Sequence, residues 1–198
     1  MGFTIIAGAP KVGKSWFTLQ LALAVSTGGI ILQKKVEKGS VLYLALEDSP
    51  RRLKERMKKQ GWTAGLGCDF VVMGDFEDWL GKLDENGMQK LVEYLESKDY
   101  RLIVIDTLSR AVRGDQNEVE EMTTSLAPLQ VLAHRLNCTV VIVDHHKKSG
   151  MAWGEIDVVG DILGSTAKGA LADTAVGIYR ERGKAGAKLA IVGKEVED

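Results

Sequence analysis

The chain has 198 residues, of which 45% are hydrophobic, enough to form one domain with a substantial core. Its 26 basic and 27 acidic residues give a net charge of -1, which excludes a generally cationic surface and leaves any polyanion to bind at local patches. No apolar run is long enough to cross a bilayer and the start lacks a secretion-signal pattern, so we expect a cytoplasmic protein with no membrane partner.

Short apolar runs alternate with longer amphipathic segments, as is typical of a parallel sheet with crossover helices. We expect strands at 3–7, 40–46, 69–73, 101–105, 138–144, 174–179 and 187–192. We expect helices at 14–27, 50–60, 87–97, 117–136 and 165–172. No internal repeat or linker divides the chain, so we predict one bare α/β core, without flanking elements, spanning residues 1–198.

A complete phosphate-binding motif, G-x-x-x-x-G-K-[ST], follows the first expected strand. Its glycines let backbone N–H groups wrap around phosphate oxygens, and the next helix directs its positive dipole end at the same place. We expect Lys14 to reach the β- and γ-phosphates of ATP and the Ser15 hydroxyl to bind Mg²⁺. The alternative is a chance glycine-rich turn, against which the flanking strand and helix argue. The residues assigned to the nucleotide are Gly8, Ala9, Pro10, Lys11, Val12, Gly13, Lys14, Ser15 and Trp16.

The strand expected at 40–46 ends in a pair of acids, Glu47 and Asp48. A carboxylate at that edge can orient and polarise the water that attacks a γ-phosphate, so we nominate Glu47 as the general base. The alternative for Glu47 is capping of the helix expected at 50–60. Asp48 or Ser49 can fill that role, and Ser49 followed by Pro50 has the form of a helix start.

The next strongly apolar strand, YRLIVID, ends in Asp106 and has the form of a Walker B motif. Ligands of open α/β sheets collect at the carboxyl ends of the strands, which places Asp106 beside the phosphate loop. We expect it to hold Mg²⁺ directly or through water, the alternative being an acid that only caps the following loop.

The helix expected at 117–136 has apolar residues at three- and four-residue intervals. This spacing predicts one stripe that packs on the core. The stripe consists of Val119, Met122, Leu126, Leu129, Leu132, Ala133 and Leu136.

The buried strand CTVVIVD delivers His145 and His146 to the same edge of the sheet. An imidazole there can donate a hydrogen bond to the γ-phosphate and report its presence. Two adjacent histidines are also a common feature of solvated loops, and their spacing does not fit a zinc site.

Two loops at this edge have the composition of a single-strand binding surface. The loop after Asp106 supplies two arginines, and the loop after the histidines supplies two lysines and an aromatic ring that can stack on a base. Glycine-rich loops with such residues also occur without this role. The candidate DNA contacts are Arg110, Arg113, Lys147, Lys148 and Trp153.

Five stretches in this order resemble RecA-like P-loop ATPases of the AAA family, in particular the branch that contains the plasmid hexameric replicative helicase RepA. They are GAPKVGKSWFTLQLALAVSTG, VLYLALEDSPRRLKERM, RLIVIDTLSRAVRG, VVIVDHHKKSG and DILGSTAKGALADTAVGIYRERG. The resemblance implies a mainly parallel twisted sheet flanked by helices, with a C-terminal antiparallel strand pair. It also implies that Glu47 is the catalytic base, that Asp106 binds Mg²⁺ and that His145 senses the γ-phosphate, with His146 as the alternative.

The resemblance further implies a hexameric ring in which ATP lies between subunits and a cation reaches across to stabilise transition-state charge. Arg180, Arg182 and Lys194 are the candidates for that cation, and the alternative for each is an edge-strand charge that discourages aggregation. The channel of such a ring would hold single-stranded DNA.

The sequence therefore favours a Mg²⁺-dependent ATPase motor, a helicase core or a replication or recombination ATPase. A nucleotide-dependent binding or sensor protein is the main alternative, and a small-molecule kinase is a third. ATP is favoured over GTP because the chain has no [NT]-K-x-D guanine-recognition element.

Overall fold

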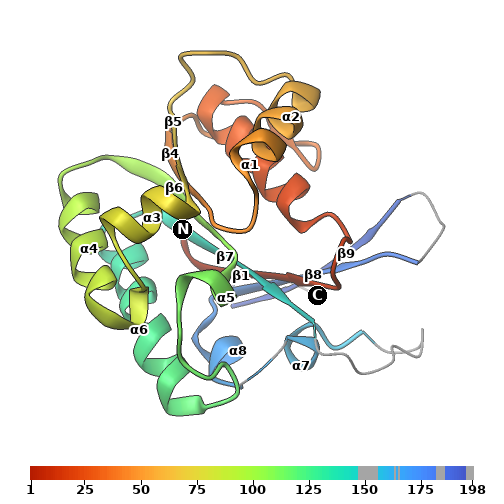
Figure 1. The fold of residues 1–198 in the computed structure, drawn as a ribbon. Coiled ribbons are helices and arrows are strands. Elements are labelled where there is room, and N and C mark those ends of the chain that lie inside the picture. The colour runs from red at the N-terminus through yellow and green to blue at the C-terminus, as the bar shows by residue number, and fades with distance from the viewer. Residues whose placement is uncertain (147–155, 163, 165, 182–185, 195–198) are drawn as a thin grey trace.

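The computed structural model describes residues 1–146, 156–162, 164, 166–181 and 186–194. Within them, one seven-stranded sheet has the order β5-β4-β6-β7-β1-β8-β9 (Figure 1). Neighbouring strands from β5 to β8 pair in parallel, and β9 runs antiparallel to β8. The sheet strands are β1 (Gly2–Gly8), β4 (Ser40–Ala45), β5 (Cys68–Val72), β6 (Tyr100–Asp106), β7 (Thr139–His145), β8 (Thr174–Tyr179) and β9 (Lys188–Gly193). This confirms the α/β fold with its C-terminal antiparallel pair.

All five expected helices are present, and several short elements were not predicted. The expected helices are α1 (Lys14–Thr27), α2 (Pro50–Gln60), α4 (Met88–Glu96), α6 (Val119–Arg135) and α8 (Ala167–Leu171). The unpredicted elements are α3 (Met73–Trp79), a π-helical turn η1 (Leu83–Gly87), α5 (Leu108–Ala111), α7 (Val158–Asp161) and a hairpin of β2 (Ile30–Ile31) and β3 (Lys34–Lys35). Within the described ranges, none of the helices has the length and apolar character that a bilayer crossing requires.

Helices cover both faces of the sheet, so the molecule has three layers (Figure 1). Adjacent strand residues point to opposite faces: Ile5 packs in the cluster that includes α4 and α6, and Ile6 packs in the cluster that includes α1 and α2. Strands buried on both faces need apolar residues throughout, which explains their continuous apolar runs. Each fully buried Leu or Ile contributes roughly 1.5–3 kcal/mol.

The predicted stripe of α6 is correct except at its first residue. Met122, Leu126 and Leu129 are buried, whereas Val119 is 53% exposed. Val119 begins the helix, and its neighbours Glu118, Glu120 and Glu121 are exposed as well, because this first turn precedes the part of α6 that packs on the sheet.

Parallel pairing brings the ends of four strands to one edge. Gly8 of β1 lies opposite His145 of β7, and Ala45 of β4 lies opposite Asp106 of β6. The segments that leave these strand ends therefore share one edge of the sheet, as ligand sites of open α/β sheets require.

Candidate nucleotide site

The phosphate loop joins β1 to α1 through a backbone that needs glycine at two positions. A Cβ on Gly8 would lie 2.8 Å from Val12 Cγ1 and 3.0 Å from the carbonyl oxygen of Ile178, so close packing requires glycine there. Gly13 caps α1 with a φ of 114°, a conformation that residues with a side chain rarely adopt. This turn directs the N-terminus of α1 towards the loop, where the helix dipole favours an anion.

Lys14 is folded back onto its own loop. Its Nζ donates hydrogen bonds to the carbonyl oxygens of Gly8 (2.8 Å) and Ala9 (3.2 Å), and lies 3.3 Å from His145 Nδ1. The side chain is only 6% exposed, and burial lowers the pKa of Lys14, an effect that the negative charge of Glu47 opposes. The ammonium is therefore positioned to exchange its carbonyl partners for phosphate oxygens.

His145 is the histidine that faces Lys14. Burial, followed by the positive charge of Lys14, lowers the pKa of His145, so the imidazole is neutral at pH 7. An ammonium can only donate, so Nδ1 accepts from Lys14 and the ring proton lies on Nε2. His145 can thus donate one hydrogen bond from Nε2 to a phosphate oxygen.

His146 points elsewhere. Its ring lies 4.8 Å from the ring of Tyr179, and its backbone N–H donates to the carbonyl oxygen of Gly8. Neither ring nitrogen has a hydrogen-bond partner in the described part of the chain. This arrangement favours His145 over His146 as the phosphate sensor.

Asp106 is a buried carboxylate with one satisfied oxygen. Tyr43 donates its hydroxyl hydrogen bond to Asp106 Oδ2 at 2.9 Å, and the same hydroxyl lies 2.8 Å from Thr18 Oγ1. Burial raises the pKa of Asp106 to about 6, which the nearby Ser15 hydroxyl opposes. The other oxygen, Oδ1, is buried and accepts no hydrogen bond of ordinary geometry from any described residue.

These groups fit a magnesium ion. Mg²⁺ prefers oxygen ligands, keeps several waters and is usually bound by one or two protein oxygens together with substrate phosphates. The buried Oδ1 of Asp106 and the hydroxyl of Ser15 supply such oxygens beside the phosphate loop.

Glu47 is exposed just after β4, at the same edge. Its charge raises the pKa values of Lys14, Asp106 and His145, so it lies within electrostatic reach of all three. Ser49 caps α2 by accepting the backbone N–H of Arg52 at 3.4 Å. Since Ser49 provides the cap, capping does not account for Glu47.

The family model for the AAA domain matches residues 1–151, which is most of the chain. The chain belongs to the AAA domain family. The match includes the phosphate loop, Glu47, Asp106 and His145, and ends before α7.

Curated relatives of this AAA domain carry the name DNA repair protein RadA. The chain is 26% identical over 154 residues to RadA of Streptococcus pneumoniae (strain ATCC BAA-255 / R6), covering 76% of this chain and 31% of that protein. For RadA of Streptococcus pyogenes serotype M6 (strain ATCC BAA-946 / MGAS10394) the identity is also 26% over 154 residues, covering 76% and 29%. The chain thus spans less than a third of these relatives' length. The family match and the sheet order together show the RecA-like P-loop α/β fold.

Of the other residues assigned to the nucleotide, Pro10 and Lys11 are exposed in the loop, and Trp16 is 38% exposed on the first turn of α1. The Arg56 guanidinium carbon lies 5.7 Å from its ring centroid, and Gln60 donates to its carbonyl oxygen at 2.8 Å. Arg56 also pairs with Asp48. The contacts of Trp16 with Arg56 and Gln60 thus join α1 to α2 beside the site.

The three candidates for a cation that acts between subunits are placed differently. Arg180 is exposed directly after the carboxyl end of β8, while Arg182 lies outside the described residues. Lys194 follows β9, which returns antiparallel to β8, and its Nζ lies 2.8 Å from Asp173 Oδ1 at the opposite edge of the sheet. The fold does not bring Lys194 to the phosphate edge of its own chain.

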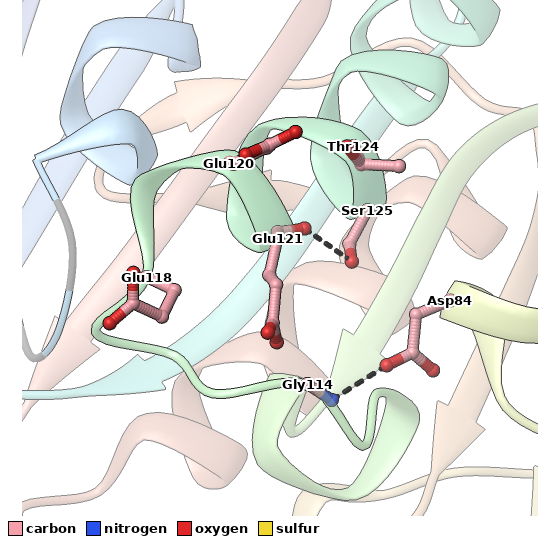
Figure 2. Close-up of a pocket in the computed structure, with 7 residues that line it drawn as sticks. All are labelled: Asp84, Gly114, Glu118, Glu120, Glu121, Thr124 and Ser125. Carbon is pink, nitrogen blue, oxygen red and sulfur yellow. Dashed lines mark hydrogen bonds between the residues drawn. The ribbon is translucent and has the colours of Figure 1, made fainter.

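Of the candidate DNA residues after β6, Arg110 lies in α5 and Arg113 lies in the loop that follows it. This loop borders an acidic pocket, where Figure 2 shows the backbone N–H of Gly114 donating to Asp84. Arg110 and Arg113 are exposed, and Arg113 Nη1 lies 2.8 Å from Glu85 Oε1. The neighbouring pocket, of about 600 Å³, is lined by Asp84, Gly114, Glu118, Glu120, Glu121, Thr124 and Ser125. Its carboxylates disfavour a phosphate backbone near Arg113. Lys147, Lys148 and Trp153 lie outside the described residues.

Several polar residues that support the site had no predicted role. Tyr43 donates to Asp106 and is itself hydrogen-bonded to Thr18, and a fully buried Lys168 pairs with Asp144 next to His145. The signal available for Asp144 was a charged residue within an otherwise apolar strand. Lys168 gave no comparable signal, because helical lysines are usually exposed.

Proposed function

We propose that this chain hydrolyses ATP with Mg²⁺ and that hydrolysis drives a RecA-like motor on single-stranded DNA, as in the RepA-type helicase branch. The observation that carries the proposal is the meeting of Lys14, His145 and the unsatisfied buried oxygen of Asp106 at one edge of the sheet. The DNA part is supported by the similarity to DNA repair protein RadA.

Each residue has a defined task in the proposed reaction. Lys14 leaves the carbonyls of its loop and binds the β- and γ-phosphates, while Asp106 and Ser15 hold Mg²⁺. The ion, when bound, neutralises charge that develops on the phosphate oxygens. Glu47 orients a water towards the γ-phosphorus and accepts its proton as the bond to the bridging oxygen breaks. His145 donates from Nε2 to the γ-phosphate.

The proposal extends to a ring of identical subunits, with residues 1–198 forming one ATPase core. In such a hexamer, Arg180 or Arg182 of one subunit would face the nucleotide of the next, because both follow β8. Such a cation can raise the rate by a factor of about 10³–10⁵. Arg110, Lys147, Lys148 and Trp153 are the proposed DNA contacts. Arg113 is the weakest candidate because of its acidic surroundings.

A second candidate function is a nucleotide-dependent sensor or binding protein in which hydrolysis only times assembly. The acidic pocket favours it, because carboxylates next to the loop after β6 repel a polyanion. The two functions differ in whether single-stranded DNA accelerates hydrolysis.

The test measures ATP hydrolysis with and without single-stranded DNA in the parent, Lys14→Ala and Glu47→Gln. The matched controls are Lys54→Ala and Glu55→Gln, both at exposed positions of α2. Loss of the general base is expected to lower the rate by about 10²–10⁴. DNA stimulation that both site variants abolish and both controls retain supports the motor. Equal rates with and without DNA support the sensor instead, and phosphate transfer to a metabolite would overturn both.

A further inference from the structure

A buried ion pair lies between the candidate nucleotide site and the loop after β6. The side chains of Lys168 in α8 and Asp144 in β7 are both fully buried, with Nζ 2.7 Å from Oδ2. The same Nζ donates to Gln116 Oε1 at 2.7 Å. Burying two charges is costly unless both are well paired, and an apolar pair of similar volume would often stabilise the fold as well. This cost points to a role for the ion pair beyond stability.

The ion pair has hydrogen-bonded contacts on two sides, here called its two arms. The first arm runs through Asp144 to the nucleotide site. Asp144 Oδ1 accepts the backbone N–H of His145 at 2.8 Å, so the two carboxylate oxygens bind Lys168 and the peptide of the candidate sensor. His145 Nδ1 in turn lies 3.3 Å from Lys14 Nζ. A shift of His145 upon phosphate binding would therefore move or reorient the Asp144 carboxylate.

The second arm reaches the loop at 112–118, between α5 and α6. The ammonium of Lys168 binds the side chain of Gln116, and the backbone of Gly164 lies close to the carbonyl oxygen of Gln116. A Cβ at Gly164, whose φ is +95°, would lie 2.2 Å from the carbonyl oxygen of Gln116, so the contact requires glycine. The loop follows Arg110 and carries Arg113, two of the candidate DNA contacts.

We propose that Lys168 is a positioning residue that couples the phosphate edge of the site to the loop at 112–118, through Asp144 on one side and Gln116 on the other. An ammonium has three donors, which lets one side chain hold both arms at once. The coupling is reciprocal: a nucleotide that orders the loop binds more tightly when a ligand on the loop has already ordered it. The DNA side of this inference rests on the proposed function, whereas the nucleotide-to-loop side does not.

The variant that separates coupling from folding is Gln116→Met. Lys168→Met would leave the Asp144 carboxylate buried without its partner and threaten the fold. Gln116→Met keeps the Lys168–Asp144 pair and removes only the arm to the loop. The matched control is Gln130→Met, which removes a different glutamine hydrogen bond to α8, that of Gln130 Nε2 to the carbonyl oxygen of Leu171 at 2.8 Å.

The experiment measures amide hydrogen exchange of residues 112–118 with and without Mg²⁺ and a non-hydrolysable ATP analogue. In the parent and in Gln130→Met, the analogue is expected to slow exchange of the loop amides by about tenfold or more, and in Gln116→Met by less than about twofold. Equal protection in Gln116→Met, or no protection in the parent, overturns the coupling. ATP hydrolysis measured on the same proteins separates the two proposals. DNA stimulation without loop protection refutes only the coupling, and protection without stimulation refutes only the motor.

Discussion

Replacing Asp106 with asparagine removes a carboxylate whose pKa burial raises from 3.8 to about 6. The folded state holds this proton more tightly than the unfolded chain does. The stability that Asp106 contributes is therefore fully present below pH 3.8 and is lost as the pH rises through 6. At about 1.4 kcal/mol for each pH unit between the two pKa values, the raised pKa of Asp106 costs about 3 kcal/mol of stability at pH 8 and about 1.6 kcal/mol at pH 5.

Asp106→Asn is accordingly expected to raise the free energy of unfolding by about 3 kcal/mol at pH 8 and by about half of that at pH 5. Asparagine keeps an oxygen that can accept the hydroxyl hydrogen bond of Tyr43. Urea unfolding of parent and variant, without nucleotide or metal, measures the difference as a midpoint shift of about 1 M or more at pH 8. Asp78→Asn, at an exposed position of α3, is the matched control and is expected to change stability by less than about 0.5 kcal/mol.

Mg²⁺ and nucleotide should reverse the order of the two proteins. A ligand at a thousand times its Kd stabilises the folded state by about 4.1 kcal/mol, which exceeds the advantage of the variant at pH 8, and only the parent retains the carboxylate that binds the ion. A variant that is no more stable than the parent at pH 8, or a gain that does not shrink towards pH 5, would refute the assignment of this cost to a buried carboxylate.

Three further predictions concern the same site. The affinity for Mg²⁺ in the presence of nucleotide should fall as the pH drops below about 6, by up to about tenfold per pH unit, because Asp106 must lose its proton to bind; a flat titration calorimetry profile from pH 7 to pH 5 would contradict this. Tyr43→Phe removes the hydroxyl between Thr18 and Asp106 and should weaken Mg²⁺ binding by about 10–100-fold with little loss of helix signal in circular dichroism; unchanged binding would show that the hydroxyl does not position the carboxylate. Gly13→Ala should cost about 1–3 kcal/mol of stability through its φ of 114° alone, since nothing lies within 4 Å of the added Cβ; an equally stable variant in urea would show that the loop readily adopts another conformation.

The sheet and the phosphate loop could be predicted because their signals are local. Continuous apolar runs mark strands buried on both faces, and the glycines and lysine of the loop follow one another in sequence. Helices α3, α5 and α7 span at most seven residues, too few for a helical period to show. That parallel strands end at a common edge was sufficient to place Asp106 and His145 beside Lys14.

The contacts that hold the site could not be predicted, because they join distant parts of the chain. Tyr43 and Asp106 are 63 residues apart, and the partners of Lys168 come from two other elements. Lys194 illustrates the opposite case: the antiparallel return of β9 was expected, and it implies that a residue after β9 lies at the edge away from the phosphate loop. An antiparallel β8–β9 pair therefore predicts that Arg180, after β8, and Lys194, after β9, lie at opposite edges of the sheet.

The contacts of Lys14 with its own loop and with His145 lower the affinity for ligands that cannot replace them. An incoming anion must replace the contacts of Nζ with Gly8, Ala9 and His145 before it gains the ammonium for itself. A lone phosphate or sulfate offers few oxygens in return, whereas adjacent β- and γ-phosphates can engage the lysine, the loop N–H groups and the imidazole together. The hydrogen bonds within the phosphate loop thus select against the small inorganic anions that would otherwise compete with nucleotide.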